Sequence, residues 1–318
     1  MFFEHSMVGL NIVYLIGLGI ILAISANAVV KSTAYISQRL RIRSFLLGFL
    51  ILGFATTIPE MMVSYQSVID RVPQLAIGNL LGGSILLLSL VMGGSALILK
   101  RVILDHGMTR RDIGLSTLVV ALPAIALWDG ALSRFEGLFL VCVYFLHIVF
   151  INHEQNFVSS VEQNAKNVKR PIHAAFIGIG GLIGLAFSSR YIVFISENLA
   201  TSFGISPFVV GLFLVTFGTN LPEITLAAQA VIHKKRDIAF GDVLGSAVMN
   251  TPILGMIGLI APFSVSDHLK IRATLILLIG TTLFFWWAAS SKRDITRKEG
   301  IVLLMVYIVF VLFEFMNV

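Results

Sequence analysis

The chain has 318 residues, of which 57% are hydrophobic and only 13% charged, with a mean hydropathy of +0.93. Water-soluble domains carry about a quarter charged residues, so this composition excludes them and indicates a membrane protein. The formal net charge of +6 does not indicate a nucleic-acid-binding protein, because the basic residues lie in short clusters between apolar runs.

Apolar stretches long enough to cross a bilayer recur along the whole chain. The first follows a segment, Met1 to Asn11, that has no Lys or Arg and so lacks the basic region of a secretory signal; we expect this span to be retained. The sequence predicts an all-α membrane protein with about ten transmembrane helices, near residues 10–30, 44–69, 74–98, 112–129, 135–152, 172–199, 205–232, 238–263, 271–290 and 299–316.

The positions of Lys and Arg test this layout, because cytoplasmic loops are enriched in positive charge. Loops on one side of the predicted membrane receive 18 of the 23 Lys and Arg residues, whereas the other side receives only Arg71, Arg134, Lys270 and Arg272. This alternation predicts that both termini lie outside. Because no large central loop is present, we expect a multi-pass protein of a prokaryotic cytoplasmic (inner) membrane.

The longest polar connection, near 153–171, divides the chain into two halves of five predicted helices each, 1–152 and 172–318. It is too short for a folded domain, so we interpret it as a cytoplasmic linker. Five is an odd number, so the second half must enter the membrane from the opposite side to the first. The halves are therefore predicted to be inverted.

An internal repeat supports this division. The segment FATTIPEMMVSYQSVI (54–69) is echoed by FGTNLPEITLAAQAVI (217–232), and AIGNLLGGS (76–84) by AFGDVLGSA (239–247). Both pairs are separated by 163 residues without a gap, and Pro, Glu, Gln and Gly residues match in step. Inverted repeats with interrupted helices are a recurrent design of secondary transporters, whose substrate site lies between the repeats near the bilayer midplane.

The repeat places two acidic residues, Glu60 and Glu223, inside predicted spans. An ionised side chain at that depth costs about 2.5–3.5 kcal/mol even on lenient insertion scales. No Lys or Arg shares either motif, so bound metal ions, Na⁺ or protons are the remaining means of neutralising these residues. We predict that Glu60 and Glu223 form a cation or metal site.

Residues beside each glutamate can supply further oxygen ligands. Each glutamate follows a proline, which cannot donate a backbone hydrogen bond and so frees the carbonyl four residues earlier. A threonine four residues before each glutamate lies on the same helix face. The predicted carbonyl ligands are Ala55 and Gly218, and the hydroxyl ligands are Thr56 and Thr219. Such oxygens suit hard cations such as Ca²⁺ and Na⁺; the alternative is that these side chains only hydrogen-bond to neighbouring helices.

The motifs TTIPE (56–60) and TNLPE (219–223), each followed by a glycine-rich segment, resemble the two alpha repeats of the cation/Ca²⁺ exchanger superfamily, and most of all its short prokaryotic Na⁺/Ca²⁺ exchanger-like members. The repeats would span about 44–90 and 207–253. The resemblance implies a transporter rather than an enzyme, with no cofactor, that moves Ca²⁺ and Na⁺ (or H⁺) while its first and sixth helices slide. It adds four cation ligands: Thr57, Asn220, Ser246 and Asn250.

The first repeat departs from the family pattern. Gly83 and Leu87 stand where the resemblance implies a serine and an amide or acid, whereas the second repeat keeps Ser246 and Asn250. Ser84 and Ser89 are nearby but are predicted to lie on other helix faces. We expect the Ca²⁺ core to survive and the Na⁺ sites to be fewer, so the counter-ion and the stoichiometry stay open.

The function predicted from these features is secondary active antiport, with Na⁺ and Ca²⁺ competing for the two glutamates by alternating access. Two carboxylates cannot both stay ionised in an empty low-dielectric site, so we expect it to hold a proton. A Ca²⁺/H⁺ antiporter on the same fold is the alternative, and an intramembrane enzyme or a non-transporting homologue is a distant one. Inorganic cations and the lipid bilayer are the expected partners, without nucleic acid. The oligomeric state stays open, although a monomer would suffice.

One further acidic residue, Asp242, matches Asn79 of the first repeat. It opens the predicted span near 238–263, close to the cytoplasmic face. We interpret it as a helix-start residue, because aspartate is favoured at that position; the alternative is that it guides ions inward.

Overall fold

The computed structural model describes residues 2–39, 49, 53–103, 109–155, 171–232, 236–264, 268–291 and 294–316. Its α-helices are α1 (Phe2–Arg39), α3 (Gly53–Thr56), α4 (Ile58–Ile69), α5 (Pro73–Ile85), α6 (Met92–Leu99), α7 (Arg110–Ala126), α8 (Arg134–Gln155), α10 (Pro171–Phe203), α11 (Pro207–Val210), α12 (Thr216–Thr219), α13 (Leu221–Ile232), α14 (Arg236–Ile260), α15 (His268–Ser291) and α16 (Arg297–Met316). Two π-helical segments, η2 (Leu86–Val91) and η4 (Gly211–Val215), continue α5 and α11.

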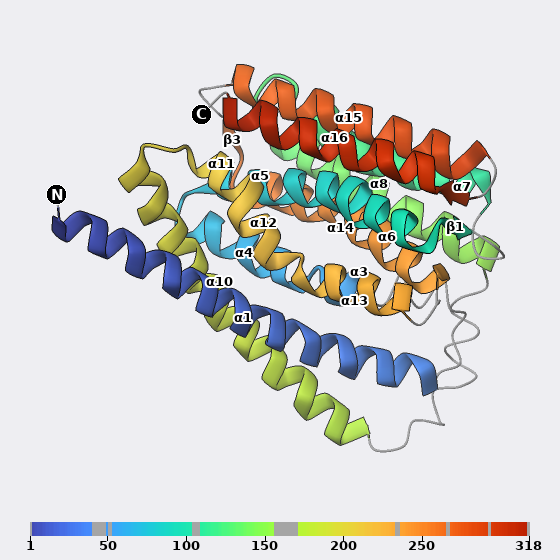
Figure 1. The fold of residues 1–318 in the computed structure, drawn as a ribbon, viewed down its shortest axis with the longest axis horizontal. Helices are drawn as coiled ribbons and strands as arrows, with labels where there is room; N and C mark the ends of the chain where they lie inside the picture. The colour runs from blue at the N-terminus through green and yellow to red at the C-terminus, as the bar shows by residue number, and fades with distance from the viewer. Residues whose placement is uncertain are drawn as a thin grey trace.

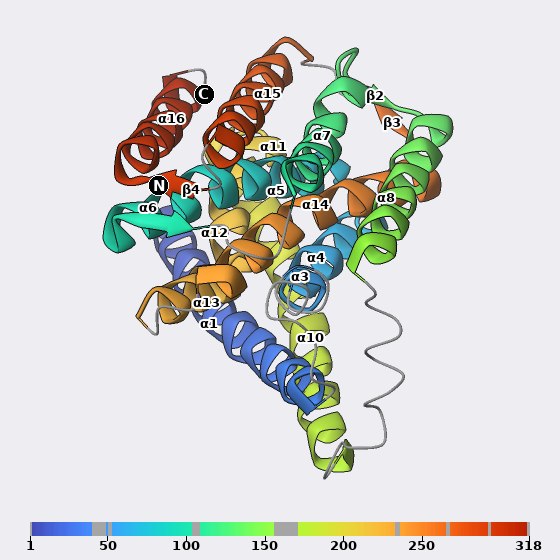
Figure 2. The ribbon, with the colours of Figure 1, turned by 90° about the vertical axis from the view of Figure 1, so that its right-hand side faces the viewer.

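The two glycine-rich segments form the centre of the molecule. The continuous segment Pro73–Leu99 is 94% buried and Phe240–Ile260 of α14 is 83% buried, whereas the apolar stretch of α1 is only 22% buried. The long helices α1 and α10 pack against each other on one side of this centre, and α15 and α16 lie on the other (Figures 1 and 2). The most deeply buried helices are therefore those that contain or adjoin the predicted site.

Six described helical segments are long and apolar enough to cross a membrane: they lie in α1, α5 to α6, α8, α10, α14 and α15. The helix pair Pro207–Thr219 and Leu221–Ala228, bent by 45°, makes a seventh when it is counted as one span. Helices α4, α7 and α16 fall in the three other predicted spans. The all-α membrane fold is confirmed, while the number ten stays a prediction.

Four short strands, which the sequence did not predict, reveal how the halves are related. Strand β1 (Arg101–Ile103) pairs antiparallel with β4 (Asp294–Thr296), and β2 (Ala131–Leu132) pairs antiparallel with β3 (Phe263–Ser264). The 163-residue offset carries Arg101 to Ser264 and Ala131 to Asp294, so one strand pair corresponds to the other. The two pairs lie at opposite ends of the bundle (Figure 1). Exchanging the halves therefore reverses their direction, as inverted repeats require.

The same offset relates the starts of α8 and α16. The backbone N–H and hydroxyl of Ser133 donate to Glu136 at 2.8 and 2.7 Å, and those of Thr296 donate to Glu299 at 2.7 and 2.8 Å. Both arrangements are capping boxes, which satisfy the unpaired donors at a helix N-terminus. The repeat therefore extends well beyond the glutamate motifs, to the last helix of each half.

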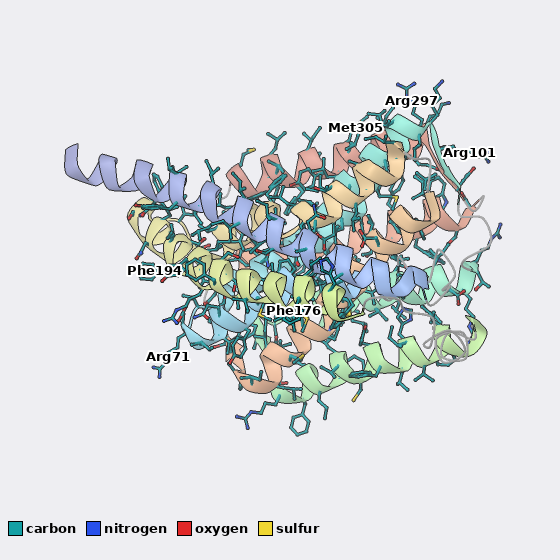
Figure 3. The ribbon with its side chains drawn as sticks, turned by 90° about the horizontal axis from the view of Figure 1, so that it is seen from below. Arg71, Arg101, Phe176, Phe194, Arg297 and Met305 are labelled. Carbon is teal, nitrogen blue, oxygen red and sulfur yellow. The ribbon has the colours of Figure 1, made fainter. Side chains whose placement is uncertain are left out.

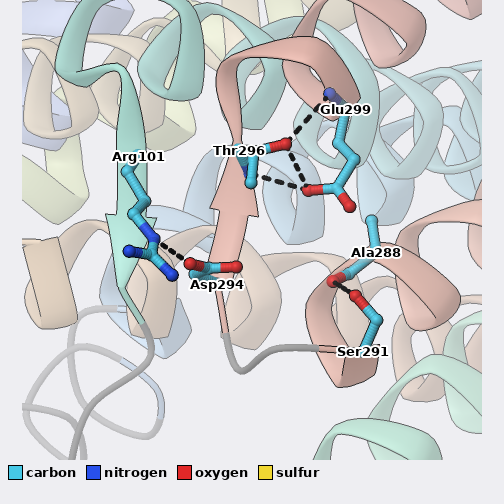
Figure 4. A network of polar contacts seen from close by, with 6 residues as sticks. All are labelled: Arg101, Ala288, Ser291, Asp294, Thr296 and Glu299. Carbon is cyan, nitrogen blue, oxygen red and sulfur yellow. Dashed lines mark hydrogen bonds and ion pairs between the residues drawn. The ribbon is translucent and has the colours of Figure 1, made fainter.

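The strand pair β1–β4 also contains an ion pair. Arg101 of β1 pairs with Asp294 of β4, whose side chain is 1% exposed (Figure 4). The pair fixes the end of α6 against the start of α16, next to the Thr296 capping box. Its counterparts in the other half, Ser264 and Ala131, carry no charge.

Charged and apolar side chains are distributed as a membrane protein requires. Arg101 and Arg297 project at one end of the bundle and Arg71 at the other (Figure 3). Phe176, Phe194 and Met305 lie on the outer helices of the bundle and are 71%, 59% and 55% exposed. This agrees with the predicted sidedness of the loops, whose absolute orientation stays a prediction. Of the predicted linker at 153–171, residues 153–155 lie in α8 and 171 in α10, while 156–170 lie outside the described residues.

Glycines allow the central helices to touch backbone to backbone. A Cβ atom at Gly78 would lie 2.0 Å from the carbonyl oxygen of Phe208, and one at Gly211 would lie 2.1 Å from that of Leu75. In the other half, a Cβ atom at Gly245 would lie 2.1 Å from the carbonyl oxygen of Phe49. These glycines are required for close packing of the helices, since real Cβ atoms cannot approach a carbonyl so closely.

Replacing Gly78 with alanine should lower the thermal stability of the purified protein, because two backbones would have to separate. Overpacking of this kind costs about 1–3 kcal/mol. Gly94→Ala is the matched control, since a Cβ atom there meets nothing within 4 Å. The measurement is the melting temperature in detergent, followed by size-exclusion chromatography. Equal melting temperatures for the two variants would contradict the close contact.

Candidate cation-binding site

Both glutamates follow a break in a membrane helix. The first break is the turn at Thr57 between α3 and α4, and the second is the turn at Asn220 between α12 and α13. Each break lies two residues before a proline, Pro59 or Pro222, as the lost backbone donor predicts. Each glutamate therefore lies in the first turn of a new helix, where the helix dipole favours negative charge.

Glu60 and Glu223 are 1% and 0% exposed, and none of their four carboxylate oxygens has a hydrogen-bond partner among the described residues. Glu223 interacts electrostatically with both Glu60 and Asp242, so three acidic side chains lie near one another. Thr219 is the neighbouring hydroxyl of Glu60, and Thr56 is that of Glu223, although neither reaches ideal hydrogen-bond geometry. Each threonine thus faces the glutamate of the opposite repeat rather than that of its own.

One hydrogen-bond network beside the glutamates is centred on Asn79 of α5. The hydroxyl of Thr219 donates to Asn79 Oδ1 at 3.0 Å, and the hydroxyl of Thr216 lies 3.3 Å from the same atom. All three side chains are buried. This network joins the central helix of the first half to the broken helix of the second half.

The network that corresponds to it under the repeat is centred on Asp242 of α14. The hydroxyl of Thr56 lies 3.3 Å from Asp242 Oδ1 and 2.8 Å from the hydroxyl of Ser246, which also lies 3.3 Å from the carbonyl oxygen of Gly53. The interpretation of Asp242 as a helix-start residue is wrong, because α14 begins at Arg236 and the Asp242 side chain is 0% exposed. Its match to Asn79 in the repeat was the signal that could have placed it here.

Two predicted amide ligands meet beside Gly83. A Cβ atom at Gly83 would lie 3.2 Å from Asn220 Nδ2 and 3.3 Å from Asn250 Nδ2. Asn220 donates through Nδ2 to the Thr216 carbonyl at 3.0 Å, and Asn250 donates through Nδ2 to the Leu80 carbonyl at 3.2 Å. Because these bonds use the nitrogen ends, the amide oxygens remain to act as acceptors, and Asn250 Oδ1 is buried without a partner.

The first repeat offers less on this face, as expected. Leu87 is buried at 1% exposure in η2 and carries no ligand atom. Ser84, which the sequence predicts to lie on another helix face, accepts a hydrogen bond from Asn250 Nδ2 at 3.1 Å and so contacts a predicted ligand. Its hydroxyl donates to the Leu80 carbonyl and serves to hold Asn250 in place.

The remaining predicted ligands lie beside the two breaks. Thr57 donates its hydroxyl to the carbonyl of Gly53, and Ala55 is buried one turn before Glu60. Gly218 of α12 lines an apolar groove of about 290 Å³ between α1, α10 and α12. The described residues contain no group of three His, Cys, Asp or Glu side chains arranged to hold a metal. A cation here would therefore depend on hydroxyl, amide and carbonyl oxygens as well as carboxylates.

The family model of the sodium/calcium exchanger protein matches residues 10–152 and 173–316. The chain belongs to the sodium/calcium exchanger family. It is accordingly a multi-pass membrane protein of an ion-antiport family, and the predicted membership of the cation/Ca²⁺ exchanger superfamily is confirmed.

Several known proteins resemble most of the chain. It is 28% identical to the inner membrane protein YrbG of Escherichia coli over 82% of this chain and 83% of that protein. It is also 28% identical to the putative antiporter CaxA of Alkalimonas amylolytica, over 94% and 96%. A structure of the sodium-calcium exchanger NCX_Mj, soaked with Na⁺ and Ca²⁺, matches with a TM-score of 0.70 and 25% identity over 95% of this chain and 97% of that chain.

Thr219→Val should destabilise the contact between the repeats, because the hydroxyl that reaches Asn79 is lost while the side-chain volume is kept. Interhelical hydrogen bonds in membranes contribute about 0.6 kcal/mol and at most about 1.7 kcal/mol. Thr225→Val is the control, since its exposed hydroxyl donates to the Leu221 carbonyl of its own helix and not to another described helix. Reversible unfolding in mixed micelles measures the difference, and a Thr219→Val variant as stable as the control would contradict the network.

Proposed function

We propose that this exchanger-family protein moves Ca²⁺ in exchange for Na⁺, and that both ions bind at Glu60 and Glu223. The observation that carries the proposal is the burial of both carboxylates, one from each inverted repeat, without hydrogen-bond partners among the described residues. An unpaired buried carboxylate is costly, so such a pair persists only where a cation or proton compensates it.

The surroundings of the glutamates favour hard cations. The buried polar residues at and around the two helix breaks carry hydroxyl and amide oxygens, which suit Ca²⁺ and Na⁺: Thr56, Thr219, Asn220, Ser246 and Asn250. The two helix breaks add carbonyl oxygens near Ala55 and Gly218. Sulfur and imidazole ligands, which softer metals prefer, are not among these neighbours.

Alternating access would involve the pair α1 and α10. Small residues line their contact: Cβ atoms at Gly181 and Gly184 would lie 2.7 Å from the Ser25 carbonyl oxygen and 2.2 Å from its hydroxyl. The pair lies beside the broken helices, and its own outer surface is largely exposed to lipid (Figures 1 and 2). A pair of helices attached mainly to each other can slide past the central site with little repacking.

A second candidate is Ca²⁺/H⁺ antiport on the same fold. Gly83 and Leu87 remove two oxygen ligands from the first repeat, which would reduce the number of Na⁺ ions held together. Carboxylates that lose Na⁺ partners can be neutralised by protons instead. Both candidates use the same glutamates and differ only in the counter-ion.

Glu60→Gln or Glu223→Gln should abolish Ca²⁺ flux, because each replaces a charged ligand with a neutral group of the same size. Radiolabelled Ca²⁺ uptake into reconstituted vesicles measures the loss, which should exceed about a hundredfold for a ligand that the ion cannot do without. Glu314→Gln is the control, since Glu314 is also buried in a membrane helix but accepts a hydrogen bond from Thr274, away from the repeats. Undiminished flux in either site variant would refute the proposal.

The counter-ion can be identified with the same vesicles, prepared either with a Na⁺ gradient or with a pH gradient. An outward Na⁺ gradient at equal pH should drive Ca²⁺ uptake, whereas a pH gradient without Na⁺ should leave uptake at the level of protein-free vesicles. Uptake driven by the pH gradient alone would replace Na⁺ by H⁺ as the counter-ion. Uptake under neither gradient, with the protein folded, would indicate a non-transporting homologue.

A further inference from the structure

The two halves of the site are related by the repeat but differ in charge. Asn79 and Asp242 occupy corresponding positions, 163 residues apart, in the two central helices. Asn79 accepts from Thr219, and Asp242 lies in the same relation to Thr56. The amide of Asn79, which is always neutral, is therefore replaced in the other half by a carboxyl group that can carry a negative charge.

The hydrogen bond alone does not require a carboxylate at position 242. The amide oxygen of Asn79 accepts a hydrogen bond from Thr219 of the opposite repeat at 3.0 Å, and Asp242 Oδ1 lies 3.3 Å from the hydroxyl of Thr56, also of the opposite repeat. An asparagine at position 242 would accept the same bond without introducing a charge. The charge adds a large desolvation cost to a residue that is 0% exposed.

No cationic side chain among the described residues offsets that charge. Asp242 Oδ2 is buried without a hydrogen-bond partner, and no described Lys or Arg forms an ion pair with Asp242. Its electrostatic neighbours are instead the acidic residues Glu60 and Glu223. A mobile cation that shares the space between these groups would relieve all three.

Close packing holds Asp242 toward this space. Gly245, one turn further along α14, brings the backbone of α14 against that of Phe49 and Gly53. Asp242, Ser246 and Asn250 are spaced four residues apart, so they share one face of α14. That face meets the break that precedes Glu60.

We propose that Asp242 is a specificity-determining residue of the cation site, a third carboxylate that favours divalent over monovalent cations. The inference rests on the proposed function, because it takes Glu60 and Glu223 as the cation-binding pair. The Coulomb energy between a fixed charge and an ion is proportional to the charge of the ion. Removing one carboxylate therefore weakens divalent binding by twice the free energy that it removes from monovalent binding.

The test compares Ca²⁺ and Na⁺ binding to purified wild-type protein and Asp242→Asn by isothermal titration calorimetry in detergent. We expect the Ca²⁺ dissociation constant to rise by about tenfold or more and the Na⁺ constant by about the square root of that factor. Equal factors for the two ions, or no change in either, would overturn the inference. Asp242→Ser removes the same charge while keeping an oxygen near Thr56, and it must give the same pattern where Asp242→Asn does not fold.

A double variant that moves the carboxylate from one repeat to the other provides the matched control. Asp242→Asn combined with Asn79→Asp moves the carboxylate to the corresponding position of the other repeat, and Ca²⁺ affinity should return to within about threefold of wild type. Failure of this rescue would indicate that the carboxylate at position 242 acts through local structure and would overturn the inference.

Glu60→Gln separates failure of the inference from failure of the proposed function. On the proposed function, Glu60→Gln should abolish Ca²⁺ binding whether or not Asp242 contributes to cation selectivity. Normal binding in Glu60→Gln would refute the proposed function itself, whereas lost binding in Glu60→Gln together with normal binding in Asp242→Asn would refute only the role of Asp242.

Discussion

Two carboxylates in the interior of a membrane protein impose the constraint on which the rest of this structure depends. Glu60 and Glu223 are buried, and their oxygens form no hydrogen bond with a described residue. Such groups are stable only when an ion or proton compensates their charge. The breaks at Thr57 and Asn220 fit this requirement, because a helix end presents both a favourable dipole and unpaired backbone groups.

The inverted repeat supplies the geometry that the carboxylates need. Each half contributes a broken helix and a glycine-rich central helix, and each broken helix packs on the central helix of the other half. Glycines such as Gly78 and Gly245 bring the backbones into direct contact, so side chains from both halves reach a common space. The same relation extends to the strand pairs and to the capping boxes at Ser133 and Thr296, far from the site.

The symmetry of the backbone is not matched by symmetry of the ligands. The second repeat holds Ser246, Asn250 and Asp242, where the first has Gly83, Leu87 and Asn79. Gly83 leaves room that the amides of Asn220 and Asn250 occupy, and Ser84 secures Asn250 from across the interface. The first repeat lacks two ligand oxygens and the second carries an additional carboxylate. These differences would alter which ions the site prefers while the fold stays the same.

The sequence by itself determined the membrane character, the inverted repeat, both glutamates and the helix breaks, because hydropathy, charge alternation and proline chemistry act locally along the chain. Only the tertiary structure decided that Thr219 faces Glu60, that Ser84 supports Asn250, that short strands join the loops, and that Asp242 is buried rather than at a helix end. These relations join residues that are more than a hundred positions apart. They depend on how the two halves pack, which no local pattern specifies.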